Sequence, residues 1–392
     1  MTASEKTKKS ESVSEKKHIV IATDNYVPRI DGIARFLSMF LPFISHYKIS
    51  IIAPAFKGKS VHPADITVHR VPLHFYSIGD FQVPKKPKNI RPLLEKADLV
   101  FSQTIGPVGS TVMRTAHTMQ KPLVSFVHSI EWVLVEKSLG GFNPLRGLIS
   151  AYVKRYARRL YSRCTAIIVP SNSVAEIFSL RNIKQPKYVI PLGIDTSYFK
   201  PPRSKEKAKE ALKISPNTFV VGYVGRIARE KDLLTLKRAF DKLEVKDKHL
   251  FIVGDGIPSV KKSLKGHNVT ITGRKEDVVQ YLHAFDVFAM PSLTETTCLA
   301  TLEAMACEVP VVVTKVGSMQ EYVIHKKNGF FFPKRNSLIL SLRLKNLYKN
   351  PQKAKGMGIL GRDVVLSNYQ WHSSAKKIAK VIDLHVRKGY KK

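Results

Sequence analysis

The chain has 392 residues, of which 44% are hydrophobic and 24% charged, a balance typical of a soluble globular protein, and its length predicts two domains. Lysine and arginine number 65 against 30 aspartate and glutamate, so the formal net charge is +35, a field that attracts nucleic acid, anionic membranes or phosphorylated substrates. The chain contains no apolar run of about eighteen residues, so no transmembrane helix is expected. Its three cysteines, Cys164, Cys298 and Cys307, are too few and too scattered for a disulfide framework or a zinc site, and they fit a reducing cytosol.

Residues 1–17 are polar, lack the apolar core of a signal peptide, and are expected to form a disordered tail. From residue 18 to residue 192, short β-branched, apolar segments alternate with segments of helical periodicity. The expected strands are His18–Ala22, Lys48–Ala53, Leu99–Phe101, Leu123–Val127, Ala166–Val169 and Val189–Ile190. The expected helices include Gly32–Phe43 and Leu145–Cys164. Strands that are apolar on both faces are typical of parallel sheets, so the alternation predicts a doubly wound, Rossmann-like domain over 18–192.

Two segments of this first domain are strongly basic. In 145–164, apolar side chains recur at helical spacing, and Lys154, Arg155, Arg158 and Arg159 share the remaining surface without an acidic residue. Such a helix can lie on anionic lipid, so we expect these four residues to contact a membrane. Alternatively, its apolar side packs on the sheet and its basic side faces water. The second segment, 84–91, follows aromatic residues at 75, 76 and 81. A general enrichment in lysine would explain both segments without any partner.

Residues 191–202 are turn-rich and aperiodic, and we interpret them as the linker to a second domain over 193–369. Its expected strands are Phe219–Val224, His249–Val253, Val269–Ile271, Val287–Met290, Val311–Val313 and Gly329–Phe332. Its helices include Leu233–Leu243 and Leu299–Ala306, and a last helix within 370–392, from about Trp371 to Lys388, is expected to return to the first domain. The predicted fold class is α/β, with two doubly wound Rossmann-like domains facing each other across a cleft. Open sheets bind ligands beyond the carboxyl ends of their strands, so the site is expected in that cleft.

Glycines and basic residues follow the expected strands of the second domain. Gly225, Arg226 and Lys231 lie between a strand end and a helix start. Glycine permits a tight turn, and both basic side chains can reach a diphosphate there, arginine as a fork and lysine as a point charge. A solvated, salt-bridged helix start would explain the same residues. The next two strand ends carry similar turns, which contain Gly254, Gly256 and Arg274.

Two carboxylates, Glu295 and Glu303, stand on either side of a predicted loop-to-helix junction. The first amides of a helix are unpaired donors that suit an anion such as a diphosphate. A carboxylate near the helix start suits vicinal hydroxyls such as those of a ribose. Loop, helix start and acid pair can therefore hold a nucleotide-sugar. A glutamate near a helix start also complements the helix dipole, and spacing alone does not decide between these interpretations.

Five motifs occur in a fixed order along the second domain. They are Gly225-Arg-x-x-x-Glu-Lys231, Val253-Gly-Asp-Gly256, Ala284-Phe-Asp-Val-Phe-Ala-Met-Pro-Ser292, Glu295-x7-Glu303 and Glu303-Ala-Met-Ala-Cys-Glu-Val-Pro-Val-Val-Val313. With the weaker features at 28–35 and 189–195, they make the chain resemble the family 4 retaining glycosyltransferases (group 1 type), including the lipid-glycosylating members. Such enzymes have the GT-B fold, and the resemblance covers nearly the whole chain after the tail.

The resemblance implies roles for individual residues. A UDP- or GDP-sugar would be held mainly by the second domain, with Arg226 and Lys231 on its diphosphate. Glu303 would hold the ribose, and Glu295 the donor sugar. His128 would face that sugar from the first domain, although a strand-end histidine with satisfied hydrogen bonds explains it equally well. The other donor-binding residues implied are Gly32, Gly225, Gly254, Gly256, Arg274, Thr297, Cys298 and Leu299.

The chain departs from the family pattern between the two glutamates. Family members usually have glycines and an aromatic residue where this chain has Thr296, Thr297 and Cys298, so the donor's identity stays open. A position that is often glycine is Glu308. No Asp-x-Asp pair occurs, so we expect no metal and no cofactor, with cationic side chains and helix N-termini in the metal's place.

The implied function is transfer of a hexose from a nucleotide-diphosphate sugar to a hydroxyl acceptor, with retention of configuration by same-face attack. Because of the basic segments we favour a membrane lipid or lipid-linked glycan as acceptor. We expect a cytoplasmic enzyme bound peripherally to an anionic membrane, with no nucleic-acid partner and an oligomeric state left open. The alternatives are a soluble acceptor, nucleotide-sugar binding without catalysis, and a basic nucleic-acid-binding protein, although no nucleic-acid-binding motif occurs. A nicotinamide dehydrogenase should show Gly-x-Gly-x-x-Gly after its first strand, and this chain does not.

Overall fold

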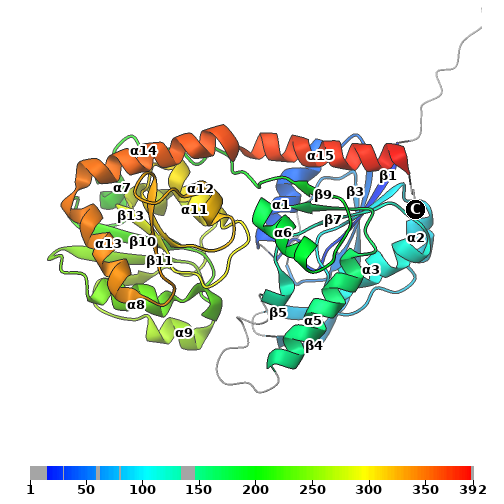
Figure 1. Cartoon of the computed structure of the whole chain (residues 1–392), viewed down its shortest axis with the longest axis horizontal. Coiled ribbons are helices and arrows are strands. Elements are labelled where there is room, and N and C mark those ends of the chain that lie inside the picture. The colour runs from blue at the N-terminus through cyan, green and yellow to red at the C-terminus, as the bar shows by residue number, and fades with distance from the viewer. Residues whose placement is uncertain (1–15, 30, 59–61, 79–80, 134–145, 390–392) are drawn as a thin grey trace, which may run out of the picture.

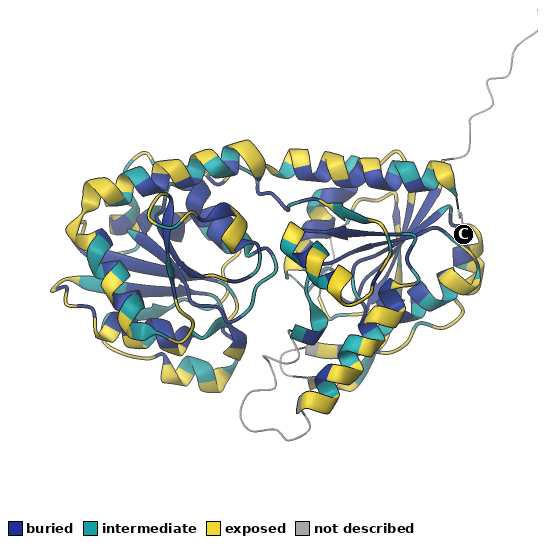
Figure 2. Ribbon diagram, viewed as in Figure 1, coloured by how far each residue is buried: buried dark blue, intermediate teal, exposed yellow. Residues whose placement is uncertain are grey.

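The computed structural model describes residues 16–389 except 30, 59–61, 79–80 and 134–145, so the expected tail lies almost wholly outside the described residues. The described chain forms two α/β domains, and its last two helices run along one side of both (Figure 1). This arrangement confirms the predicted fold class. Figure 2 shows the reason for the pattern in the sequence, because the strands of both sheets are buried while the outer faces of the helices are exposed.

A seven-stranded parallel sheet forms the centre of the first domain, in the order β3-β2-β1-β6-β7-β8-β9. Its strands are β1 (His18–Ala22), β2 (Lys48–Pro54), β3 (Ile66–Val71), β6 (Leu99–Ser102), β7 (Leu123–Phe126), β8 (Ala166–Val169) and β9 (Lys187–Val189). The helices are α1 (Gly32–Phe40), the 3-10 helix η1 (Leu41–Ile44), α2 (Arg91–Glu95), α3 (Pro107–Thr118), α5 (Arg146–Tyr161) and α6 (Asn172–Leu180). Every residue of β1, β6, β7 and β8 is buried, since separate hydrophobic clusters cover the two faces of the sheet.

The expectations and the structure differ in four places in this domain. The edge strand β3 was not predicted, because its residues alternate between buried and exposed and form no continuous apolar run. The antiparallel hairpin of β4 (Leu73–Ile78) and β5 (Phe81–Pro84) was also not predicted. The helix expected over 32–43 changes to a 3-10 helix after Phe40, because Pro42 lacks the amide hydrogen that an α-helix requires. The strand expected at 189–190 begins two residues earlier and ends at Val189.

The second domain has a six-stranded parallel sheet in the order β12-β11-β10-β13-β14-β15. Its strands are β10 (Phe219–Val224), β11 (Lys248–Val253), β12 (Val269–Ile271), β13 (Val287–Met290), β14 (Val311–Thr314) and β15 (Gly329–Phe332). Its helices are α7 (Lys205–Ala211), the 3-10 helix η2 (Arg229–Lys231), α8 (Leu233–Asp241), α9 (Pro258–Ser263), α10 (Val279–Ala284), α11 (Leu299–Ala306), α12 (Met319–Tyr322), α13 (Ser337–Lys349) and α14 (Pro351–Asn368). In each sheet the strands that follow the first one in sequence are added on one side of it, and the later strands are added on its other side. This change occurs next to β1 in the first domain and next to β10 in the second. Ligands of open sheets bind at such switch points.

The chain crosses between the domains twice, and the two crossings lie side by side. The Ile194 amide donates to the Tyr369 carbonyl, and the Trp371 amide donates to the Ile194 carbonyl, each at 2.9 Å. A Cβ atom at Gly193 would lie 2.3 Å from the carbonyl carbon of Gln370, so only glycine fits there. After this point α15 (Trp371–Lys388) packs on the first domain, where its residue Ile378 joins the hydrophobic core.

Candidate active site

A cavity of about 430 Å³ lies between the two domains, at the carboxyl ends of their central strands. The first domain contributes the start of α1, with Asp31 and Gly32, and the segment 128–130 after β7. The second domain contributes the turn after β10, η2 and the loop between β13 and α11. Of the residues predicted from sequence, the structure places nine in its lining: Gly32, His128, Gly225, Arg226, Lys231, Glu295, Thr297, Cys298 and Leu299.

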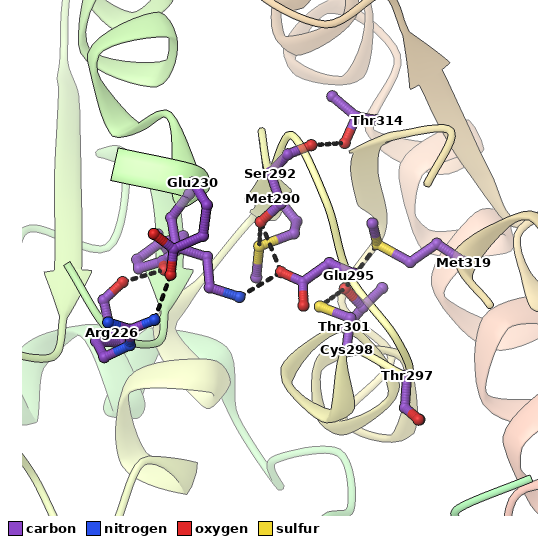
Figure 3. Close-up of polar contacts among 12 residues, drawn as sticks. Arg226, Glu230, Met290, Ser292, Glu295, Thr297, Cys298, Thr301, Thr314 and Met319 are labelled. Atoms are coloured by element: carbon purple, nitrogen blue, oxygen red, sulfur yellow. Dashed lines mark hydrogen bonds and ion pairs between the residues drawn. The ribbon is translucent and has the colours of Figure 1, made fainter. Parts of the chain in front are cut away.

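Lys231 and Glu295 form an ion pair at the wall of this cavity. The Nζ atom of Lys231 lies 2.5 Å from Oε1 of Glu295, and the Ser292 hydroxyl donates to the same oxygen at 2.6 Å (Figure 3). Burial lowers the pKa of Lys231, but the neighbouring acidic groups, Glu295 foremost, together outweigh burial, and the pKa is raised overall. The lysine therefore remains a full positive charge, held in a largely buried position where it acts strongly on an anion.

Arg226 is held in a similar way. Its guanidinium pairs with the buried carboxylate of Glu230, four residues further along (Figure 3), and its backbone carbonyl accepts a 2.8 Å hydrogen bond from the Tyr223 hydroxyl. The Leu293 amide donates to the Glu230 carbonyl at 2.8 Å, which ties the turn after β10 to the loop after β13. Arg226 and Lys231 thus face one cavity from two sides of the same turn.

The loop between β13 and α11 is fixed by residues that the sequence did not identify. The Ser318 amide donates to the Thr296 carbonyl, and the Tyr322 hydroxyl to the Thr297 carbonyl, each at 2.9 Å. Gly317 has φ +52°, and a Cβ atom there would lie 2.3 Å from the carbonyl oxygen of Glu295. The available signal was a glycine three residues after the end of β14, a weaker pattern than at 225 and 254, where the glycine directly follows the strand.

Cys298 begins helix α11 in a left-handed conformation, with φ +56°. Its Sγ atom contacts the Thr301 hydroxyl at 3.1 Å, and burial raises the pKa of the thiol to about 12. The thiol therefore stays protonated and is a poor nucleophile. No side chain caps the first amides of α11, and Leu299 and Ala300 line the cavity, so this helix start presents donors to it.

Glu303 is paired with a residue of the other domain. It is 4% exposed, and its Oε1 lies 2.8 Å from the guanidinium of Arg35 in α1. Burial raises the pKa of Glu303, and the charge of Arg35 partly offsets this rise. Arg35 also lies over the ring of Phe199, at 5.5 Å from the ring centroid. Glu303 itself does not line the cavity, so it can hold a ribose only if it exchanges this partner.

His128 faces the cavity from the first domain as a neutral imidazole. Its Nε2 lies 2.9 Å from the side-chain oxygen of Gln103, and its ring packs against Phe126 and Phe36. Burial lowers its pKa to about 3, so the ring carries no charge at physiological pH. It can exchange hydrogen bonds with a bound sugar but cannot act as a cation.

Besides Glu303, three predicted donor-binding residues lie outside the lining of the cavity. Gly254 and Gly256 support the turn after β10, since Cβ atoms there would lie 1.9 Å and 2.0 Å from the carbonyl oxygens of Gly225 and Ile227. Arg274 is exposed and is among the charges that lower the pKa of the Asp31 carboxyl, although burial raises it overall. Asp31 caps α1 by accepting from the amides of residues 33 and 34.

The basic residues of α5 also lie away from the cavity. Arg155, Arg158 and Arg159 are exposed and Lys154 is half-buried. The alternative that the apolar side of this helix packs on the sheet holds only in part. Leu148 and Tyr152 are each 70% exposed and lie on the same outer face as Arg155. Only the later apolar residues, such as Leu160, pack into the core.

Comparison with known proteins agrees with this geometry. Residues 218–350 match the family described as glycosyl transferases group 1, and residues 45–198 match glycosyltransferase family 4. A GDP-mannose-dependent alpha-(1-6)-phosphatidylinositol monomannoside mannosyltransferase of Mycolicibacterium smegmatis is 24% identical, over 93% of this chain and 98% of its own. The alpha-monoglucosyldiacylglycerol synthase of Acholeplasma laidlawii is 25% identical, over 89% and 92%.

Solved structures show the same fold over nearly the whole chain. Sucrose-phosphate synthase of Thermosynechococcus elongatus superimposes with a TM-score of 0.75 at 18% identity, covering 94% of this chain and 99% of its own. Anabaena HepE in complex with UDP-glucose gives 0.74 at 18% identity, covering 95% and 100%. With both halves matched by glycosyltransferase models and a GT-B architecture throughout, the chain belongs to the family 4, group 1 type glycosyltransferases.

Proposed function

We propose that this protein transfers a hexose from a UDP- or GDP-sugar to a hydroxyl group of a membrane lipid or lipid-linked glycan, with retention of the anomeric configuration. The observation that carries the proposal is the group of Lys231, Glu295 and Arg226 on one wall of the cavity between the domains. Family membership favours a transferase over a nucleic-acid-binding protein that has no catalytic activity.

The donor's diphosphate is the natural partner of the cationic wall. Lys231 and Arg226 are already held by carboxylates, and the uncapped start of α11 adds backbone donors. Breaking the bond between sugar and diphosphate places new negative charge on the leaving group, so fixed cations and dipoles lower the barrier. These groups would supply the stabilisation that a metal ion gives in other transferases.

The sugars of the donor would be held by the acids and by His128. Glu295 has one carboxylate oxygen engaged by Lys231 and Ser292, and its other oxygen can accept from a hexose hydroxyl. Glu303 would accept from the ribose hydroxyls after releasing Arg35. The neutral His128 ring completes the wall on the side of the first domain.

Same-face attack fits the groups in the cavity best. The acceptor oxygen attacks the anomeric carbon, the bond from that carbon to the diphosphate oxygen breaks, and the acceptor proton passes to the departing phosphate. A covalent intermediate would need a protein nucleophile, and the Cys298 thiol, although it lines the cavity, has a raised pKa and stays protonated. The Glu295 carboxylate is engaged by two donors, which reduces its nucleophilicity.

A membrane acceptor is supported by the surface of the first domain and by the relatives. Leu148, Tyr152 and Arg155 form an exposed amphipathic face on α5, and Phe75 on the hairpin is 98% exposed. α5 and β5 both pack against α3, and Figure 1 shows α5 and the hairpin at the same end of the domain. Two of the relatives are named as a phosphatidylinositol monomannoside mannosyltransferase and a monoglucosyldiacylglycerol synthase, and both names refer to lipids. No helix among the described residues is long and apolar enough to span a bilayer. We propose that the enzyme binds peripherally to the cytoplasmic face of a membrane.

The test is a two-step assay. Thermal-shift screening of UDP- and GDP-sugars identifies the donor, and the donor, labelled in its sugar, is then incubated with a membrane extract. We expect label in the lipid fraction, with an α-linkage by NMR if the donor is α-linked and configuration is retained. Label found only in water-soluble products would reject the lipid acceptor, and an inverted linkage would reject the mechanism.

A further inference from the structure

A second cavity lies within the first domain, separate from the cleft. It has a volume of about 730 Å³ and is lined by Ile52 of β2, by the segment 69–72 at the end of β3, and by residues of the segment 85–96. It shares no lining residue with the cavity between the domains. The hairpin of β4 and β5 begins at its rim, where the Lys85 amide donates to the Pro72 carbonyl at 2.8 Å.

The cavity is lined by basic side chains and by apolar side chains that belong to the hydrophobic core or pack against it. Its basic side chains are His69, Arg70, Lys85, Lys86, Lys88 and Lys96, and no acidic side chain is among the lining residues. Arg70 and the four lysines form no ion pair with another residue of the described chain. Ile52 and Val71 belong to the hydrophobic core beneath, and the half-buried Ile90 and Leu93 pack against it.

Arg70 is the deepest of these cations and lacks a counter-charge. One guanidinium nitrogen donates to the Pro54 carbonyl at 2.9 Å, while the other, Nη2, is buried without a hydrogen-bond partner among the described residues. The guanidinium lies over the ring of Tyr26, 5.7 Å from the centroid, and burial lowers its pKa. A bound anion would offset the desolvation of this charge.

We propose that this cavity binds the phosphate group of an amphiphile, with the phosphate among Lys85, Lys86, Lys88 and Arg70 and the adjoining apolar part against Ile90 and Leu93. Multiple basic donors without competing carboxylates suit a phosphate. The apolar floor selects an amphiphile over a free ion. The lining has no Phe, Tyr or Trp side chain on which a nucleic-acid base could stack, which disfavours single-stranded RNA.

The inference deepens the proposed function, because a phosphate-bearing lipid held here would lie in the domain that we expect to receive the acceptor. Binding itself does not depend on transfer. Tyr26, against which Arg70 packs, belongs to the connection between β1 and α1 that also carries Asp31 and Gly32 of the cleft. The phosphate site and the cleft are therefore joined by one short segment.

The experiment is calorimetric titration of the full chain, without donor, with three probes: dihexanoyl phosphatidic acid below its micelle concentration, inorganic phosphate, and dihexanoylglycerol. We expect phosphatidic acid to bind about tenfold or more tightly than phosphate, and dihexanoylglycerol not to bind. The triple variant Lys85→Gln, Lys86→Gln, Lys88→Gln should weaken phosphatidic acid binding by about tenfold or more, because it removes three charged donors.

The matched control is Lys376→Gln, Lys377→Gln, Lys380→Gln, which makes the same change of charge on the exposed face of α15. It should leave the affinity unchanged. Equal loss in both variants, equal affinity for phosphate and phosphatidic acid, or displacement of the lipid by single-stranded RNA would each overturn the proposal. Nucleotide-sugar binding, measured in parallel, separates the two proposals, since loss of transfer in a protein that still binds phosphatidic acid rejects only the proposed function.

Discussion

At the scale of single residues, the candidate active site consists of charges that already have partners. Lys231 is paired with Glu295, and Arg226 with Glu230. Each pair holds its cation in place at the cavity, so little reorganisation is needed when an anion binds.

Replacing Lys231 by alanine tests the cationic wall. We expect kcat to fall by about 10²–10³-fold, the usual effect of removing one preorganised donor to developing negative charge. Circular dichroism should show an unchanged fold. The control is Lys242→Ala, an exposed lysine at the end of α8. Turnover near that of the unmodified protein would remove Lys231 from the proposed mechanism.

Glu131 gives the protein a predicted pH dependence. Burial raises its pKa to about 7, although the Tyr161 hydroxyl donates to it at 2.9 Å, and its other oxygen, Oε2, has no partner among the described residues. The folded state therefore holds this proton more tightly than the unfolded chain. Its contribution to stability is complete below about pH 4.5 and is lost as the pH rises to about 7.

Denaturant unfolding at pH 5 and pH 8 checks this prediction. The unmodified protein should lose about 1–3 kcal/mol more than Glu131→Gln over this range, because the glutamine cannot ionise. The difference between the two proteins isolates Glu131 from the histidines that titrate in the same window. Parallel pH profiles would show that Glu131 is ionised at pH 5.

At the scale of elements, helix α5 has one face in the core and another face exposed. Ala157, Leu160 and Tyr161 pack into the first domain, while Leu148, Tyr152 and Arg155 point outward. Spacings of three and four residues put the outward side chains on one face, with the apolar residues nearer the start of the helix and arginines nearer its end. A core helix would bury its large apolar residues, so this exposed pair calls for a partner surface.

Replacing Arg155, Arg158 and Arg159 by serine tests this face. Each basic residue near an anionic bilayer contributes about 1 kcal/mol, so binding to anionic liposomes should fall by about tenfold or more. Sedimentation with vesicles measures it, with the same substitutions at Lys376, Lys377 and Lys380 of α15 as the control. Equal sedimentation of the two variants would reject α5 as the membrane face.

At the scale of the whole molecule, Arg35 joins the two domains across the cleft. It belongs to α1, and its contacts, Glu303 and Phe199, belong to the second domain. The two chain crossings lie together at one point, beside residues 193 and 370. An ion pair at the cleft and a paired connection at one side form an arrangement in which the domains can open and close.

Replacing Arg35 by methionine tests this link. The change leaves Glu303 buried without its partner, so the unfolding midpoint should fall by the equivalent of about 1–3 kcal/mol. Small-angle scattering without ligand should show a larger radius of gyration, because the cleft loses its ion pair. The control is Arg181→Met, at an exposed position after α6. Scattering and midpoint identical to those of the control would show that this pair does not hold the domains together.

The sequence by itself determined the elements that are buried on both faces. Strands such as β1, β8, β10 and β13 have the predicted limits, because a strand between two layers of helices must be apolar throughout and is bounded by turn residues. The same reasoning identified the turn at 225 and the acid pair, since strand-end glycines and helix starts have local signatures. It missed β3, whose exposed edge allows polar residues.

Only the tertiary structure decided which charges meet. Arg35 and Glu303 are 268 residues apart in sequence, and no local pattern relates them. The segment 85–96 was visible as a basic stretch, but its concave, acid-free setting around Arg70 depends on how β2, β3 and the hairpin pack together. The physical reason is that periodicity and turn chemistry act over a few residues, whereas ion pairs, cavities and pKa shifts depend on distances and burial that exist only once the two domains have folded and closed on each other.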